Sequence, residues 1–170
     1  VMRTIKGPGI FLAQFIGGQP PFNSLEGLTD WAAGLGYKAL QIPCNHKAIF
    51  DLERAASSQA YCDEVRGILA ERGLSISELS THLEGQLIAV HPAYDDAFDG
   101  FAPPEVRGNP QARQRWATQM LMHAAKASKN LGLSAHATFS GALAWPYLYP
   151  WPPHNAALLD EAFDKLARLW

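Results

Sequence analysis

Apolar residues occur along this chain in two alternating patterns, short continuous runs and longer stretches with helical spacing. The first run, Gly9–Phe15, is apolar on both faces, which is typical of a parallel strand that is covered on both sides. Pro20 and Pro21 then break the chain. Three further runs predict strands, at Tyr37–Pro43, Ser75–His82 and Leu133–Phe139.

Helical stretches separate and follow these runs. A first helix carries Leu25, Leu28 and Leu35 on one stripe and has Asn23 or Ser24 as a candidate cap. Glycine follows three of the helical stretches directly, as it does at many helix C-termini. These glycines are Gly36, Gly73 and Gly132. The other expected helices are Ser58–Arg72, Gln111–Leu131 and Ala156–Trp170, and residues 83–109 are expected to form a long loop.

The resulting order, βαβαβαβα, predicts right-handed crossovers and a parallel sheet in an α/β fold. Two architectures compete, a small doubly wound sheet and the N-terminal half of a (β/α)8 TIM barrel. The first strand–helix connection, Ile16–Asn23, has no G-x-G-x-x-G motif for a dinucleotide. Long loops follow the strands, whereas the turns that precede strands are minimal. This asymmetry favours four β/α units of a barrel, a single partial domain over residues 1–170.

The composition and charge of the chain limit the classes of partner that it is expected to bind. The chain has 170 residues, 48% of them apolar and 18% charged, and a formal net charge of −2. It has no basic stripe, so a nucleic-acid partner is not expected. Its apolar runs are shorter than the ~20 residues that span a bilayer, and its first residues do not form a secretory signal. We therefore expect a cytoplasmic protein without a membrane partner, with Cys44 and Cys62 as free thiols.

Four segments resemble the xylose-isomerase-like TIM barrels, a family usually described as sugar phosphate isomerases/epimerases. These segments are GPGIFLAQF (Gly7–Phe15), ELSTHLEGQLIAVHPAYD (Glu78–Asp95), DGFAPPEVRGNPQAR (Asp99–Arg113) and ATFSGALAWPYLYPWP (Ala137–Pro152). The resemblance runs from Thr4 to Trp170. It implies a (β/α)8 barrel about twice as long as this chain, of which these residues form the N-terminal half.

The resemblance also implies a divalent metal of the Mn, Mg, Co or Zn class in the complete barrel. In that family two Glu, one Asp and one His on strands of the second half hold the metal. No metal ligand is therefore assigned in this chain, which is expected to bind no metal alone and to be inactive in isolation. The implied partners are a sugar or sugar derivative and either a C-terminal half-barrel or a second copy of the chain.

His82 is the best candidate for a catalytic residue, because it ends the third expected strand, where barrel side chains point at the reaction space. The alternative is a core histidine that bonds to backbone. Glu84 and Gln86 follow at alternate positions and are expected either to bond sugar hydroxyls or to be solvated loop residues. His91 is a weaker candidate, and His136 is expected to be a buried histidine with hydrogen-bond partners.

Aromatic residues lie at the end of the fourth expected strand and in the loop after it. Phe139, Trp145 and Tyr147 are predicted to bind substrate, and Tyr149 and Trp151 continue the loop. Rings on a loop stiffened by proline suit the apolar C–H face of a sugar. The alternatives are a hydrophobic lid and a subunit contact. Arg107 and Arg113 are weak candidates for contact with an anionic group.

The expected chemistry of the complete barrel is proton abstraction beside a carbonyl group, as in a sugar or keto-sugar isomerase or epimerase. The family resemblance carries that expectation. Elimination or hydration of a keto-sugar uses the same α-proton chemistry and remains open. Two non-enzymatic alternatives also remain, a half-barrel that dimerises as a structural module and a sugar-binding module without turnover.

Overall fold

The structure, a computed structural model, describes residues 5–147 and 155–170. Its contacts divide the chain into two compact units. The first unit comprises the chain up to Thr81 together with Met122–Ala137. The second comprises His82–Leu121 and Thr138–Trp170. Among the described residues, no helix is both long and apolar enough to cross a membrane.

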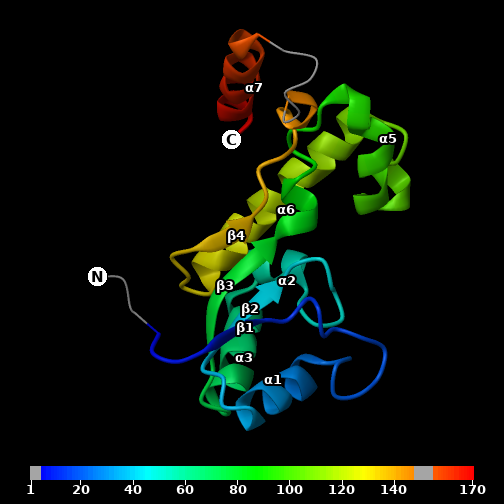
Figure 1. The fold of residues 1–170 in the computed structure, drawn as a ribbon. Coiled ribbons are helices and arrows are strands. Elements are labelled where there is room, and N and C mark those ends of the chain that lie inside the picture. The colour runs from blue at the N-terminus through cyan, green and yellow to red at the C-terminus, as the bar shows by residue number, and fades with distance from the viewer. Residues whose placement is uncertain (1–4, 148–154) are drawn as a thin grey trace. The chain divides into compact units, whose positions relative to one another are not determined.

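Four strands form one parallel sheet in the order β1-β2-β3-β4, which is also their order in the sequence (Figure 1). The α/β class predicted from the sequence is therefore confirmed. In the sheet register, Gly9 pairs with Ala39 and Ala39 pairs with Ser75. The strands are β1 (Gly9–Phe11), β2 (Ala39–Pro43), β3 (Ser75–Thr81) and β4 (His136–Thr138).

The two outer strands are shorter than the sequence predicts, for local reasons. After β1 the Leu12 amide still bonds to Gln41 O on β2, at 3.1 Å, but the Phe15 amide then turns back to Leu12 O. Before β4 the Leu133 amide donates to Ser128 O at 2.9 Å and so belongs to the end of the preceding helix. Apolar sequence alone does not reveal that these residues have other hydrogen-bond partners.

Serine side chains start two helices of the first unit. Ser24 Oγ accepts the Gly27 amide at 3.1 Å and begins α1 (Leu25–Gly34), and Ser58 Oγ accepts the Tyr61 amide at 3.2 Å and begins α3 (Gln59–Ala70). Ser58 also ends a short helix, α2 (Leu52–Ser57), that the sequence pattern did not predict. The remaining long helices are α6 (Pro110–Asn130) and α7 (Ala156–Leu169).

Glycine ends three helices with the same pair of hydrogen bonds, as predicted. Gly36, Gly73 and Gly132 have φ of 87°, 68° and 72°, in the left-handed region that glycine tolerates best. At the first of these ends the Gly36 amide donates to Ala33 O and the Tyr37 amide to Ala32 O. The same two bonds recur after α3 and α6.

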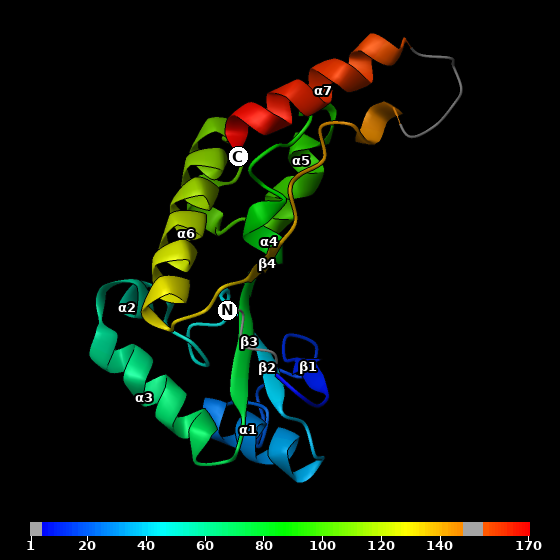
Figure 2. The ribbon, with the colours of Figure 1, turned by 90° about the vertical axis from the view of Figure 1, so that its left-hand side faces the viewer.

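The core of the first unit lies between the strands and the helices beside them. In Figure 2, α3 runs alongside β3, and α1 also packs against α3. Cys44 and Cys62 are both buried and do not form a disulfide. Residues with at most 1% of their surface exposed include Leu12, Leu28, Leu40, Ile42, Phe50, Cys62, Val65, Leu69 and Leu79.

In the second unit, the segment predicted as one long loop contains short helices. They include α4 (His82–Gly85), α5 (Asp95–Phe98) and three 3-10 turns, Pro92–Tyr94, Asp99–Phe101 and Pro104–Val106. Apolar residues of this segment pack against α6 in a core of Leu87, Ile88, Phe98, Ala102, Ala117 and Ala142. The prediction of one continuous loop was therefore wrong. The helices of this segment are too short to show a helical period of apolar residues in the sequence, and their packing in this core is not visible there.

Candidate functional site

His82 and Phe139 occupy equivalent places in the chain. His82 is the first residue after β3, and Phe139 is the first residue after β4, the neighbouring strand in the sheet. Their rings meet edge to face, with centroids 4.6 Å apart and planes at 60°. His82 is half-buried and Phe139 is 54% exposed. An imidazole and an open aromatic face therefore stand together after the carboxyl ends of adjacent parallel strands, where α/β proteins commonly bind ligands.

Glu84 lies two residues beyond His82, in α4. It is only 4% exposed, so it is not a solvated loop residue, one of the two alternatives that its sequence position allowed. Burial raises the pKa of this carboxyl group, and a hydrogen bond from its own backbone amide offsets part of that effect. A carboxyl group with a raised pKa can hold or release a proton closer to neutral pH than an ordinary glutamate.

The end of α4 packs very closely against the chain after β4. A Cβ atom on Gly85 would overlap both Thr138 Oγ1 and the carbonyl oxygen of Phe139. Gly141 has φ of +116°, and a Cβ there would lie 2.6 Å from Ala89. These two glycines let the segment that follows β4 approach the segment that follows β3, and so position His82 beside Phe139.

A second group of rings surrounds Trp145 and Tyr147. Trp145 meets Tyr94 and Phe98 edge to face, at centroid distances of 5.9 and 5.4 Å. Tyr147 meets His91 in the same way, at 6.1 Å. Because half of the Trp145 surface is exposed (49%), this indole has both a packing role and an open face. The predictions for Tyr149 and Trp151 lie outside the described residues.

The ring partners Tyr94 and Phe98 were not among the predicted site residues. They lie in the segment that the sequence pattern treated as loop, so their contact with Trp145 had no periodic signal. The aromatic residues among the acidic residues of YDDAFDGF were the available clue.

Gln86 is half-buried, and its backbone amide donates to His82 O at the end of α4.

His136 has hydroxyl partners on both ring nitrogens, in agreement with the interpretation as a satisfied histidine. Thr81 Oγ1 lies 2.7 Å from Nε2, and Ser128 Oγ lies 3.4 Å from Nδ1. The ring is half-buried in β4. These contacts join the last residue of β3 to β4 and to α6, so His136 has a structural role.

Arg113 is committed to an internal ion-pair network and is not open to a substrate. It is 1% exposed, and Nη1 lies 2.7 Å from Asp95 O and 2.5 Å from Asp99 Oδ1. Nη2 pairs with the Asp95 carboxylate. A hydrogen bond from the Gly108 amide, with further help from Arg113, lowers the pKa of Asp99. This network fastens the segment of short helices to α6.

The described residues contain no group of three or more His, Cys, Asp or Glu side chains that could hold a metal ion. The divalent metal that the family resemblance implies stays a prediction for the second half of the barrel.

The structure therefore brings together His82 and Phe139, and separately Trp145 with Tyr94 and Tyr147 with His91. It buries Glu84, which excludes the solvated alternative for that residue. Comparison of the sequence with protein-family models and with curated proteins found no match.

Proposed function

We propose that this chain supplies the first four β/α units of a (β/α)8 barrel. The supporting observation is the strand order β1-β2-β3-β4, which never reverses. A doubly wound sheet reverses its order at a switch point, whereas a barrel adds each strand beside the one before it. The three short glycine turns before strands and the longer segments after them agree with the same architecture.

In that barrel, the residues after β3 and β4 form a wall of a sugar site. The pair His82–Phe139 carries this proposal, because it combines a hydrogen-bonding imidazole with an exposed ring. The ring suits the apolar C–H face of a sugar and the imidazole suits a hydroxyl or carbonyl group. The proposed reaction class is α-proton transfer on a sugar or keto-sugar, as in isomerases and epimerases. Glu84, Gln86, Trp145 and Tyr147 are the further substrate-binding candidates.

A sugar-binding experiment tests this proposal. Isothermal titration with a panel of aldoses, ketoses and their phosphates is expected to give saturable binding to the isolated chain. His82→Gln is expected to weaken that binding by about tenfold or more, because a buried polar contact is lost. His46→Gln, in a loop of the first unit, is the matched control and should leave the affinity unchanged. Equal effects of both variants, or no saturable binding to any member of the panel, would contradict the proposal.

The partner of the chain is a separate question. β1 and β4 are the edge strands of the sheet, and folded proteins protect such edges. In addition, Phe163 and Trp170 on and after α7 are 61% and 51% exposed. Both observations favour an additional covering element, either a C-terminal half-barrel or a second copy of this chain. The second copy would make the chain a dimeric structural or sugar-binding module without catalysis.

A native mass spectrum separates these possibilities. A homodimer without metal supports the module, and a complex with a second fragment of similar size and one divalent ion supports the interrupted enzyme. The isolated chain is expected to catalyse no α-proton exchange in deuterated water. Incorporation of deuterium beside the carbonyl group of a bound sugar would overturn that expectation.

A further inference from the structure

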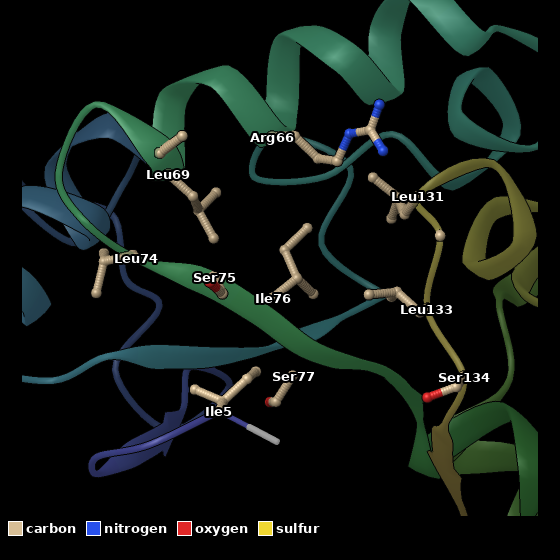
Figure 3. A pocket seen from close by; sticks show the side chains of 12 residues that line it. Ile5, Arg66, Leu69, Leu74, Ser75, Ile76, Ser77, Leu131, Leu133 and Ser134 are labelled. Carbon is tan, nitrogen blue, oxygen red and sulfur yellow. The ribbon is translucent and has the colours of Figure 1, made fainter. Parts of the chain in front are cut away.

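The first unit contains a cavity of about 750 Å³, which is distinct from the residues around His82. It lies at the amino-terminal end of β3, between that strand, α3 and the turn that follows α6 (Figure 3). This volume is within the range of about 300–1,000 Å³ that is common for small-molecule sites. The cavity thus has room for a small ligand, separate from the proposed sugar site.

The cavity exists because β4 begins late. Leu133, which the sequence places in the strand, instead caps α6 through its amide, and pairing in β4 starts only at His136. The Ser75 amide donates to Lys38 O on the side of β2. The N–H and C=O groups of successive residues in a strand point to opposite sides. Those of Ile76 are therefore directed away from β2, to the side where the cavity lies.

Apolar side chains form about half of the wall, and polar groups form the rest. Leu69 from α3 and Ile76 from β3 lie opposite Leu131 and Leu133 in Figure 3. Leu74, just before β3, also lines the cavity. A ligand would therefore need an apolar body to displace water from this surface.

One cation interrupts the apolar wall. Arg66, on α3, pairs through Nη2 with Asp63, one turn earlier on the same helix. A Cβ atom on Gly132 would lie 3.8 Å from Nη1, so the other arm of the guanidinium reaches the turn after α6. Asp63 thus takes one arm of the guanidinium, while Nη1 lies beside Gly132, another residue at the cavity. An arginine held in this way is well suited to a carboxylate or phosphate oxygen.

We propose that this cavity binds a small amphipathic anion, with its apolar body among the leucines and its carboxylate or phosphate on Arg66. The three serines at the cavity, Ser75, Ser77 and Ser134, supply further hydroxyl donors. This site is independent of the sugar site, since it belongs to the other unit and to the opposite end of β3.

Binding of octanoate, octyl phosphate and uncharged octanol to the chain tests the proposal. Titration calorimetry is expected to show saturable binding of at least one of the two anions, and the stronger of them identifies the preferred head group. Arg66→Gln should weaken binding of that anion by about tenfold or more and leave octanol unaffected. Arg54→Gln is the control, because Arg54 is a similarly exposed arginine of the same unit, ion-paired to Glu64, that does not line the cavity.

A second variant tests the location. Ser134 is exposed at the cavity, so Ser134→Trp should fill the space without disturbing the core and should abolish binding of all three ligands. The proposal is overturned if neither anion binds saturably. It is also overturned if Arg66→Gln and Arg54→Gln have equal effects, or if Ser134→Trp binds the anions as the unchanged chain does.

Discussion

The rings of His82 and Phe139 touch edge to face at a centroid distance of 4.6 Å, and each residue directly follows a strand of the same sheet. Neighbouring strands of a parallel sheet deliver their following residues to the same edge. The contact therefore follows from the sheet order β1-β2-β3-β4, which places β3 and β4 side by side.

Replacement of Phe139 by Ala is expected to weaken sugar binding by about two- to tenfold, because an aromatic contact contributes roughly 0.5–1.5 kcal/mol. The 54% exposure of Phe139 means that the folded state should lose little stability. Titration with the best ligand of the sugar panel measures the effect. Phe101→Ala is the control, since Phe101 is 43% exposed in the same unit and packs on Phe98. A Phe139→Ala variant with unchanged affinity would remove this ring from the site.

Glu84 is expected to make the folded state less stable as pH rises. Its pKa is raised by burial, so the folded state holds the proton more tightly than the unfolded chain does. The stabilising effect is complete below the ordinary glutamate pKa and is lost as pH rises through the raised value. Each unit of difference between the pKa of Glu84 in the folded and in the unfolded state corresponds to about 1.4 kcal/mol of unfolding free energy.

Urea unfolding between about pH 4 and about pH 8 measures this dependence. Glu84→Gln should remove the fall in unfolding free energy and should be more stable than the unchanged chain at the upper end of the range. Glu105→Gln, at an exposed position of the same unit, should keep the fall. A Glu84→Gln variant with the same pH profile as the unchanged chain would mean that this carboxyl group does not titrate in that range.

Arg113→Ala is expected to destabilise the second unit by roughly 3–5 kcal/mol, because it leaves the carboxylates of Asp95 and Asp99 without their buried cation. Arg115→Ala changes an exposed arginine of the same helix and should cost less than about 0.5 kcal/mol. Urea unfolding monitored by tryptophan fluorescence compares them. Similar losses in both variants would show that the ion-pair network does not stabilise the fold.

Gly141→Ala is expected to cost more than about 1–3 kcal/mol, since it combines a positive φ with a Cβ atom 2.6 Å from Ala89. Gly100→Ala is the comparison, because Gly100 has no heavy atom within 4 Å of its Cβ position and no positive φ. The difference between their thermal midpoints measures the effect. If the Gly141 variant also weakens sugar binding, the segment after β4 positions Phe139.

Local signals in the sequence predicted much of the first unit. Helix caps and helix ends are short-range features. Ser24, one of the two candidate caps, begins α1, and Gly36, Gly73 and Gly132 end helices where the sequence placed them. The extent of β1 and β4 was overestimated, because apolar sequence does not show that the amides of Phe15 and Leu133 bond to residues a few positions earlier. The strand order needed the structure, because it depends on partners that are distant in sequence.

The candidate site was predicted as separate residues rather than as an arrangement. His82 and Phe139 were both chosen for their places at the ends of expected strands, but their contact depends on the close approach allowed by Gly85. The burial of Glu84 and Arg113 was missed because charged residues are usually exposed. Only the tertiary structure shows what surrounds them.

The glycine turns bear on how such a chain can change in evolution. Helices of ten, twelve and twenty-one residues, α1, α3 and α6, all end with the same two hydrogen bonds. The join to the next strand is therefore built from the last turn of the helix alone. Whole turns can be added or lost at the start of a helix while the following strand keeps its point of entry into the sheet, so variation in length is absorbed in the segment that joins the preceding strand to that helix.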